Sequence, residues 1–439
     1  MEIPESILLV SSHQDPAGTH IHDAICQQLK HHSDISGRYH HHRTKERLIN
    51  WFYDPNAFIQ QNPDIILFLS RHASKNPKPL LTVHVTGNYC KADLGGKPGC
   101  LTIAHPSMMH AILKNLFLYA PTGYGVSYEV THHGPTGLSL PSFFVEIGST
   151  QDEWNDIAAA NAVARAVLDA QPISVIPMIG FGGTHYAIRQ TELALQSRAA
   201  FGHIVPSRQI GDINKDMVIT MAEMTNAAAA YIDKKSLSRI EIERIKSILS
   251  DLSLPLLGQS DLISMQDIPL EQYIRIISVA EKEVPGSRVR IQSLVTCHNP
   301  VVVCISEELL SEAEKSDSDS LIAAIGAMPV ATIRKGGKNL LPVFISEEKN
   351  SRQVRHDLIH LCISIILKNS EASVNGDILT IRRVRFDPKK AQEYGIPPGS
   401  LYSTLMSGES IIHEGRCIFP NMVMTTTITS IAIPVENDV

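Results

Sequence analysis

Several residue types and patterns that would assign this protein to a special class are scarce or absent. Aromatic residues make up 5% of the 439 residues, and no apolar run reaches the roughly 18 residues that a membrane-spanning helix needs. The seven cysteines include no CxxC pair, which argues against a zinc ribbon and a dithiol redox site. The net charge of −6 provides no overall attraction to nucleic acid, so a nucleic-acid ligand would need a local basic patch.

The motifs of several large enzyme classes are also missing. The chain contains no GxGxxG, GxxxxGKS/T, GxSxG or HExxH segment, so dinucleotide-binding, P-loop, serine-hydrolase and zincin chemistry have no support. The N-terminal residues MEIPESILLVSS contain acids and pass directly into a predicted strand, unlike a signal peptide. We therefore expect a cytoplasmic protein without membrane segments, which also agrees with cysteines that show no disulfide pattern.

The composition is that of an ordinary globular protein, with 43% hydrophobic and 19% charged residues. In the first half, apolar runs of strand length alternate with helical patterns, which predicts an α/β fold with a mostly parallel sheet flanked by helices. Ligands of such sheets bind beyond the carboxyl ends of the strands. The predicted strands are residues 7–10, 64–70, 80–85, 125–131, 142–148 and 174–180, and the predicted helices are residues 106–120, 153–170 and 184–196.

The chain length suggests two or three domains, and the composition changes after residue 285. We predict one domain over residues 1–270 and a smaller α+β domain over residues 285–439. Residues 233–252 have apolar positions at helical spacing and a basic outer face, which is typical of a solvated helix. Residues 312–320, EAEKSDSDS, are predicted to form a loop.

Histidine is concentrated toward the N-terminus, since sixteen of the 20 histidines precede residue 204. The histidines at 31–32 and 40–42 lie in a polar stretch without apolar periodicity, which indicates a solvated loop. His72, His84 and His185 differ, because short apolar runs bring them to strand ends. Imidazoles brought to one edge of a sheet are typical of a metal or acid/base site.

The most informative stretch is residues 128–153, YEVTHHGPTGLSLPSFFVEIGSTQDE. His132 and His133 follow a short strand and enter a Gly/Pro turn, and the next strand carries Glu146. Neighbouring side chains on an extended strand point in opposite directions, so the two histidines share one metal only if the turn reorients them. The alternative is a polar loop with two solvated histidines, and Glu129 on the preceding strand could equally face solvent.

Five separate blocks of the first predicted domain occur in the order in which one known family has them. They are SRHASKNPKPLLTVHVTGN (70–88), YEVTHHGPTG (128–137), VEIGSTQDEW (145–154), GGTHYAIRQTE (182–192) and GHIVP (202–206). Together they resemble the archaeal and plant-type D-aminoacyl-tRNA deacylase family. The resemblance covers most of residues 1–270. It implies hydrolysis of the ester between a D-amino acid and tRNA, zinc as cofactor, and an N-terminal fold similar to phosphorylases and peptidyl-tRNA hydrolases.

Residues 386–423 resemble a short motif near the end of tRNA 3′-processing nucleases, which suggests a tRNA-related accessory element in the second domain. The lysines of the first domain point to the same partner. Lys75, Lys78, Lys91 and Lys97 flank the predicted strand 80–85, where they could form a local basic rim for tRNA phosphates.

The residue chemistry and the resemblance together indicate roles for individual side chains. Ester hydrolysis needs a positioned water, a base or metal, and donors for the oxyanion, and zinc held by neutral imidazoles lowers the pKa of its water to about 7. The predicted catalytic residues are His132, His133, Glu146 and Glu129, and the predicted zinc ligands are His84, His133 and His185. The predicted contacts to substrate or tRNA are Arg71, His72, Thr86, Asn88, Gly134, Pro135, Thr136, Lys75, Lys91 and Arg189. The turn at Gly134 and Pro135 brings bare backbone close to the substrate, where it can exclude the side chain of an L-amino acid.

Two other functions share these features. A zinc peptidase, an amidase or a nucleoside-processing enzyme on the same fold would use the histidines without needing the lysine-rich loops. A non-catalytic RNA-binding protein is the second alternative, although the scarcity of aromatic residues leaves it without a stacking platform. We expect a monomer. The sequence does not separate ligands from acid/base groups among the histidines, and it leaves the number of metal ions, the preferred D-amino acid and the role of residues 285–439 open.

Overall fold

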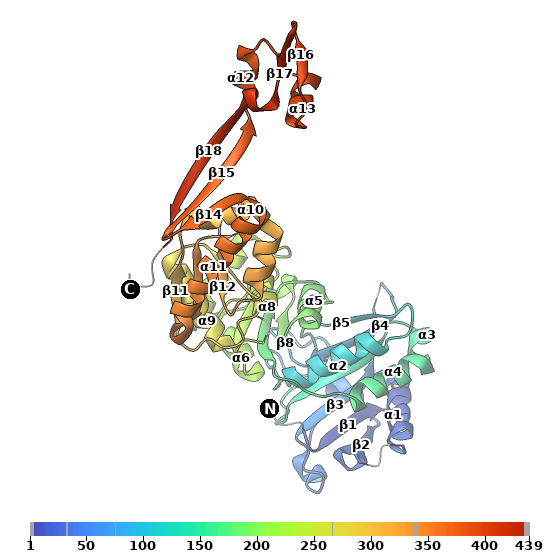
Figure 1. Ribbon diagram of the computed structural model, residues 1–439. Helices are drawn as coiled ribbons and strands as arrows, with labels where there is room; N and C mark the ends of the chain where they lie inside the picture. The colour runs from blue at the N-terminus through green and yellow to red at the C-terminus, as the bar shows by residue number, and fades with distance from the viewer. Residues whose placement is uncertain (1–3, 32–33, 75, 266, 338–339, 434–439) are drawn as a thin grey trace. The chain divides into compact units, whose positions relative to one another are not determined.

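The computed structural model describes residues 4–31, 34–74, 76–265, 267–337 and 340–433 (Figure 1). Contacts within the chain divide it into two compact units, residues 1–263 (unit 1) and residues 264–439 (unit 2). Unit 1 contains the predicted α/β fold, and unit 2 contains smaller antiparallel sheets.

The main sheet of unit 1 has six strands in the order β2-β1-β3-β6-β4-β5 (Figure 1). Strands β1, β2, β3 and β6 are parallel, whereas β4 is antiparallel to β6 and parallel to β5. The prediction of a mostly parallel sheet flanked by helices is therefore confirmed. Because β4 and β5 run in the reverse direction, their carboxyl ends lie at the sheet edge opposite to those of β1 and β3. The bounds are β1 (Ile7–Ser12), β2 (Tyr39–Thr44), β3 (Ile65–Arg71), β4 (Leu80–Val85), β5 (Gly125–Tyr128) and β6 (Ser142–Gly148).

Helices form a layer along this sheet (Figure 1). They are α1 (Pro16–Leu29), α2 (Pro106–Tyr119), the short α3 (Gln151–Trp154) and α4 (Ile157–Leu168). Helix α4 packs against both α1 and α2. Each of the three longer helices begins after a residue whose side chain accepts a backbone hydrogen bond from the first turn, as N-caps do. In α1 that residue is Asp15, whose carboxylate also accepts hydrogen bonds from the Ser70 hydroxyl and the Arg71 amide at the end of β3.

The polar histidine run of residues 40–42 is strand β2 rather than the expected solvated loop. His42 packs its ring against Trp51 and Phe58. These two residues belong to a hydrophobic core cluster that also contains Phe68 and Phe144. This segment forms a strand because it pairs with β1 at the edge of the sheet and because the imidazole of His42 packs on the hydrophobic core. His31 is exposed as expected, and His32 lies outside the described residues.

A second sheet in unit 1 has three parallel strands in the order β8-β7-β9. The segment after β5 joins it, because the Val130 amide donates to the His185 carbonyl and the Thr131 amide donates to the Ile204 carbonyl. The helix predicted from residue 184 begins only at Ile188, which leaves His185 in a loop. The elements after α4 are β7 (Ile176–Phe181), α5 (Ile188–Gln196), β8 (Ala199–Val205), α6 (Lys215–Thr225), β9 (Ala229–Ile232), α7 (Arg239–Asp251) and α8 (Gln259–Ser264).

Unit 2 contains an antiparallel sheet of order β10-β12-β13-β11, a second of order β14-β15-β18 and a hairpin of β16 and β17. Residues 312–320, expected as a loop, lie inside helix α10, whose backbone is non-helical only at Asp317. The bounds are α9 (Leu270–Glu283), β10 (Arg288–Ile291), β11 (Pro300–Cys304), α10 (Glu307–Gly326), β12 (Ala331–Arg334), β13 (Val343–Glu347), α11 (Ser351–Asn369), β14 (Glu371–Asn375), β15 (Ile378–Phe386), α12 (Pro388–Glu393), α13 (Ser400–Met406), β16 (Ile411–His413), β17 (Arg416–Ile418) and β18 (Met424–Ala432). Across the described part of the chain, no helix combines the length and apolar character needed to cross a membrane.

Candidate active site

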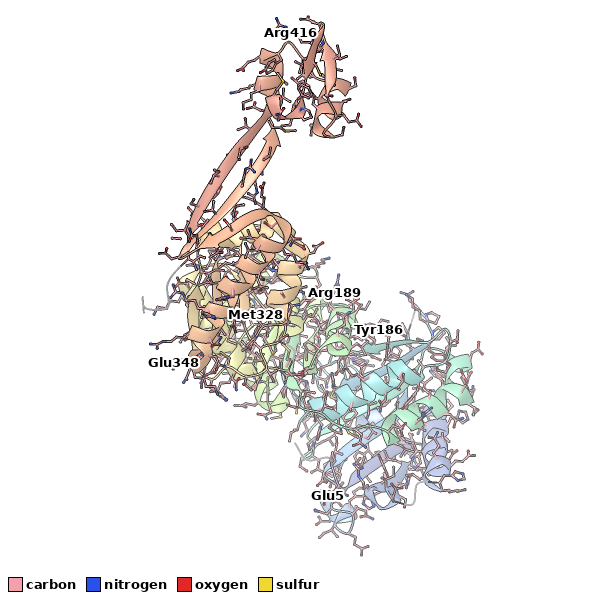
Figure 2. The ribbon with its side chains drawn as sticks, in the orientation of Figure 1. Glu5, Tyr186, Arg189, Met328, Glu348 and Arg416 are labelled. Carbon is pink, nitrogen blue, oxygen red and sulfur yellow. The ribbon has the colours of Figure 1, made fainter. Side chains whose placement is uncertain are left out.

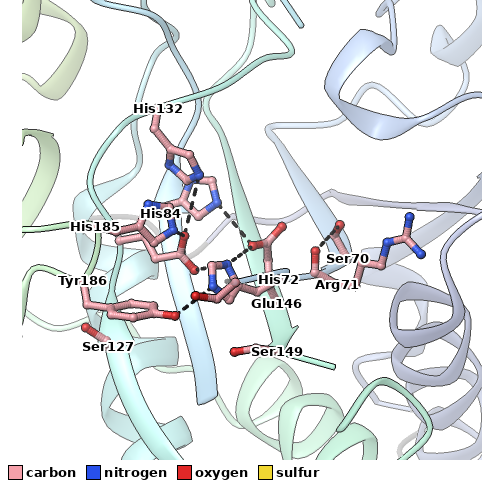
Figure 3. A network of polar contacts seen from close by, with 12 residues as sticks. Ser70, Arg71, His72, His84, Ser127, His132, Glu146, Ser149, His185 and Tyr186 are labelled. Atoms are coloured by element: carbon pink, nitrogen blue, oxygen red, sulfur yellow. Dashed lines mark hydrogen bonds and ion pairs between the residues drawn. The ribbon is translucent and has the colours of Figure 1, made fainter. Parts of the chain in front are cut away.

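Seven buried or partly buried side chains of unit 1 meet in one polar group, which we call the His–Glu cluster. Its members are His72, His84, Glu129, His132, His133, Glu146 and His185. Figure 3 labels His72, His84, His132, Glu146 and His185 among them. The imidazole ring centroids of neighbouring members lie between 4.4 and 5.2 Å apart. The solvated-loop alternative for the two adjacent histidines is therefore wrong, because His133 is 7% exposed and packs against His84.

Strand direction explains how the cluster forms. Glu146 on β6 pairs with Thr82, and Phe144 pairs with His84 on β4, so Glu146 and His84 project from the same face of the sheet. Glu129 follows β5 and donates its amide to the Val83 carbonyl, which keeps it beside β4. The expectation that all the histidines share one carboxyl edge is wrong, because β4 and β5 run antiparallel to β6.

Glu129 is the centre of the cluster. Its carboxylate oxygens lie 2.9 Å from His185 Nε2, 3.1 Å from His72 Nδ1 and 3.8 Å from His132 Nε2. The side chain is buried, so the alternative in which it faces solvent is wrong. Burial alone would raise the pKa of Glu129, but the contacts with His185 and His72 outweigh burial and hold its pKa well below the usual value. These contacts therefore favour the ionised form of Glu129 inside the protein.

Glu146 has the opposite character. Its Oε2 lies 3.6 Å from His84 Nε2 and 3.8 Å from His72 Nδ1, too far for strong hydrogen bonds. Burial and the negative charge of Glu129 raise the pKa of Glu146 well above its usual value. Two carboxyl groups whose environments separate their pKa values in this way can serve as a proton acceptor and a proton donor in one site.

Three imidazoles of the cluster present the pattern of metal ligands. The Nδ1 atoms of His84, His132 and His133 contact backbone carbonyl oxygens at 3.2, 2.7 and 2.6 Å, an arrangement that leaves Nε2 free as a ligand atom. Burial lowers the pKa of all three, for His133 to about 3, so the rings are neutral. In His72 burial also opposes the charge, but the hydrogen bond and charge of Glu129, with the charge of Glu146, raise the pKa.

The donor atoms fit a zinc ion on two observations. One ligand atom from each of His84, His132 and His133 lies within 4.8 Å of the others, and the same holds for His72, Glu129 and His185. The buried Nε2 of His84 has no hydrogen-bond partner within the described ranges, which is costly unless a further group binds there. Sets of imidazole nitrogens with carboxylate oxygens are usual zinc ligands. The structure groups His185 with His72 and Glu129, apart from the predicted partners His84 and His133.

A cavity of about 440 Å³ opens beside the cluster, beyond the carboxyl ends of β1 and β3. Such a volume is typical of a small-molecule site. Its lining includes His72, His132, His133, Glu146 and His185, together with Ser12, Gln14, Asp15, Arg47, Leu48, Ile49, Ser70, Arg71, Ala73, Leu94 and Arg208. Glu129 does not line it and acts through the imidazoles that it contacts.

Two features of the site were not predicted from the sequence, a pair of arginines in the cavity lining and a tyrosine beside the cluster. Arg47 directly precedes the short 3-10 helix Leu48–Asn50, and Arg208 lies in the 3-10 helix Ser207–Asp212. In the described part of the chain neither has an ion-pair partner. Tyr186, whose hydroxyl lies 3.0 Å from His72 Nε2, was likewise not predicted (Figure 3). Arg71, which was predicted, stacks its guanidinium over Trp154 at 4.9 Å, and the Trp154 indole N–H donates to the His72 carbonyl.

The other predicted substrate contacts lie outside the cavity lining. Thr86 is buried and bonded to Thr102, and Asn88 donates to the carbonyls of Gly95 and Lys97. Thr136 accepts a hydrogen bond from the Lys97 amide. These bonds hold residues 95–97 against the Gly/Pro turn.

The turn itself is closely packed. A Cβ added to Gly134 would lie 2.5 Å from the Ile49 carbonyl oxygen, so the bare backbone there serves packing against a cavity-lining residue. Pro135 is buried and Lys91 is exposed, whereas Lys75 lies outside the described residues. Arg189, labelled in Figure 2, forms an ion pair with Glu192 at 2.9 Å.

Comparison with known proteins agrees with this geometry. Residues 59–257 match the family described as D-aminoacyl-tRNA deacylase, a range that contains all seven members of the His–Glu cluster. Proteins named D-aminoacyl-tRNA deacylase from Methanoculleus marisnigri and Methanospirillum hungatei are 46% and 44% identical, over 98% and 97% of both chains.

A crystal structure of a conserved protein of unknown function is 31% identical, with a TM-score of 0.54, and covers 59% of this chain and 97% of its own. That share of this chain is close to the share that unit 1 makes up. The extent and identity of the sequence matches, together with the cluster that lies inside the matched range, show that the chain belongs to the D-aminoacyl-tRNA deacylase family.

Proposed function

We propose that the protein hydrolyses the ester bond of D-aminoacyl-tRNA in the cavity beside the His–Glu cluster, releasing free D-amino acid and tRNA. The observation that carries this proposal is the meeting of two buried carboxyl groups, whose pKa values are shifted in opposite directions, with five histidines at a cavity, in a chain of this family. Enzymes of this activity are hydrolases of an activated ester, so a positioned base, an acid and an electrophile suffice for catalysis.

His185 is the proposed base. Its Nε2 lies 2.9 Å from the Glu129 carboxylate, whose negative charge favours the proton on that nitrogen and leaves Nδ1 to accept a proton from the attacking water. The side chain of His185 is 31% exposed and lines the cavity, where water can reach it. As the imidazole takes up the proton, the buried negative charge of Glu129 stabilises the resulting cation.

Glu146 is the proposed acid. It lines the cavity, and its raised pKa keeps it protonated. When the bond between the carbonyl carbon and the ribose oxygen breaks, Glu146 donates its proton to that oxygen, and the water oxygen remains in the amino-acid carboxylate. His72 lies between the two carboxyl groups and also contacts the Tyr186 hydroxyl. In this position it helps to fix the orientation of both glutamates.

Zinc is the proposed cofactor, held by His84, His132 and His133. When bound, it would lower the pKa of a water molecule to about 7 and polarise the ester carbonyl. The neutral state of the three imidazoles supports this assignment, because protonated imidazoles do not bind metal.

The 3′ end of tRNA is the proposed occupant of the cavity. Arg47, Arg71 and Arg208 line it, and guanidinium groups recognise phosphate through paired hydrogen bonds. These arginines provide the local positive charge that a nucleic-acid ligand needs in a protein with a net charge of −6. A protein with this substrate acts where tRNA is charged, so we propose a cytoplasmic location. We also propose that the protein is a monomer.

The test is deacylation of D-tyrosyl- and L-tyrosyl-tRNA by purified protein, with D-aspartyl-tRNA as a second substrate. We expect release of the D-amino acids, with L-tyrosyl-tRNA largely intact. His84→Ala, His132→Ala and His133→Ala should each lower kcat/KM by roughly 10²-fold or more, whereas the exposed His31→Ala should not.

Three outcomes would contradict the proposal. Equal rates on D- and L-esters would contradict the proposed selectivity for D-amino acids. Activity on free amino-acid esters or nucleosides that is not enhanced by tRNA would favour an amidase or a nucleoside-processing enzyme. Full activity of the three histidine variants would place the site elsewhere. Metal content measured on the same preparations tests zinc, since a bound ion should be lost together with the three histidines.

A further inference from the structure

A second group of metal-binding side chains lies at the edge of the main sheet, away from the cavity. It consists of His22 and Cys26 on α1 and His41 on β2, and we call it the edge cluster. One ligand atom from each of the three residues lies within 4.8 Å of the others. None of the three lines the cavity or belongs to the His–Glu cluster.

Local structure brings the three residues together. His22 and Cys26 are four residues apart on a helix, so they lie on the same face one turn apart. His41 pairs with Leu9 in the register of β1 and β2, which places it on the edge strand beside that helix face. His41 Nδ1 lies 2.9 Å from His22 Nε2 and 3.5 Å from Cys26 Sγ.

The surroundings hold the ligand atoms in place. The buried Ser11 hydroxyl lies 2.7 Å from His22 Nδ1, a second partner that orients the ring and directs Nε2 toward His41. Second partners of this kind are usual for metal-binding histidines. Burial and the charge of Arg43 lower the pKa of His22 to about 3, so this imidazole is neutral and its lone pair is available.

Charged residues also lie near the site. Arg43 forms an ion pair with Asp23, which partly offsets the effect of its positive charge on His22. Burial raises the pKa of the Cys26 thiol, and Arg43 partly offsets this by favouring the thiolate. A bound metal ion favours the thiolate far more strongly, since coordination removes the thiol proton.

We propose that His22, Cys26 and His41 bind one divalent transition-metal ion of the zinc class, independently of ester hydrolysis. Two imidazoles and a thiolate select zinc, cobalt or nickel over magnesium and calcium, which prefer oxygen ligands. His41 is exposed, so water can complete the coordination. The ion would link the edge strand β2 to helix α1 and so stabilise the exposed edge of the sheet.

Cobalt substitution tests the site without reference to catalysis. Cobalt bound to a thiolate shows a charge-transfer band in the near ultraviolet, and the His–Glu cluster contains no cysteine, so the band reports on the edge cluster alone. Titration of the full-length metal-free protein with cobalt should produce the band, and its saturating intensity should correspond to one thiolate-bound cobalt ion per chain. Cys26→Ser should abolish the band, and His41→Gln should abolish it or weaken cobalt binding at least tenfold.

The matched control is Cys100→Ser, since Cys100 is partly exposed and belongs to no three-ligand group in the described ranges. It should keep the band. Cys26→Ser should keep near wild-type deacylation of D-aminoacyl-tRNA but show a smaller rise in Tm on addition of zinc than the wild type. A band that persists in Cys26→Ser, or no band in the folded wild type, would overturn the proposal, whereas the absence of deacylation in all these proteins would leave it intact and contradict only the proposed function.

Discussion

Replacing Glu129 by glutamine removes the charge at the centre of the His–Glu cluster while keeping the size of the side chain. The wild-type carboxylate lies 2.9 Å from His185 and 3.1 Å from His72 inside the protein. Breaking a buried charge pair by removing one partner costs roughly 3–5 kcal/mol. If this interaction is strongest when His185 has taken up the water proton, kcat should fall by about 10²- to 10⁴-fold, since each tenfold corresponds to about 1.36 kcal/mol.

The same geometry predicts how the loss divides between kcat and KM. Glu129 does not line the cavity, so it has no direct contact with bound tRNA, and KM should change by less than about threefold. A variant that loses an interaction made only in the transition state shows this pattern. Steady-state deacylation of D-tyrosyl-tRNA, together with far-UV circular dichroism to confirm folding, measures both quantities.

The matched control is Glu192→Gln, which removes a carboxylate from an exposed ion pair with Arg189. Exposed ion pairs contribute little, so this variant should keep wild-type kinetics. A folded Glu129→Gln protein with kcat within about twofold of the wild type would refute the role assigned to Glu129. A large rise in KM with unchanged kcat would refute it as well, because it would indicate a binding contact.

Three further predictions concern the acid, the arginines and unit 2. Burial and the charge of Glu129 raise the pKa of Glu146 in the folded protein above its value in the unfolded chain. Protonation of Glu146 therefore stabilises the folded state fully at a pH below the unfolded-state pKa, and this stabilisation is lost as the pH rises toward the folded-state pKa. Glu146→Gln should lower kcat by roughly 10²-fold yet raise Tm relative to the wild type increasingly from pH 5 to pH 8; a Tm difference independent of pH would contradict the protonated state. Arg47→Ala with Arg208→Ala should raise KM for D-tyrosyl-tRNA and flatten its salt dependence, without affecting D-tyrosyl-adenosine, which lacks phosphate; equal losses on both would assign these arginines to another role. A chain ending at residue 270 should keep most of kcat with a raised KM, whereas an insoluble or inactive product would make unit 2 part of the catalytic fold.

Sequence reasoning succeeded where a pattern is local. The strands predicted at residues 64–70 and 142–148 correspond to β3 and β6, because a continuous apolar run of strand length needs no information about its neighbours. The adjacent histidines at 132 and 133, and Glu146 on the next strand, were also identified from a local pattern, because imidazoles that follow a strand into a Gly/Pro turn are typical of a metal or acid/base site. The five blocks that resemble the deacylase family predicted the activity, which the periodicity of apolar residues does not indicate.

Sequence reasoning failed where the partner of a segment decides its conformation. Residues 40–42 read as a polar loop, yet β1 supplies hydrogen bonds along their length and they form an edge strand. Residues 312–320 read as a loop of acids and serines, yet they are held inside α10, where Glu312 contacts Lys315 and Arg383. In both cases contacts with residues distant in the sequence outweigh local preference.

The sequence by itself determined the α/β class, the family and the residue types of the site, since these follow from apolar periodicity and from blocks of neighbouring residues. Only the tertiary structure decided which of those residues meet. The reversal of β4 and β5 brings His84 and Glu129 to Glu146, and the loop before α5 adds His185. The ionisation states arise at the same level, because two glutamates acquire opposite pKa shifts only when burial and mutual charge act on them together.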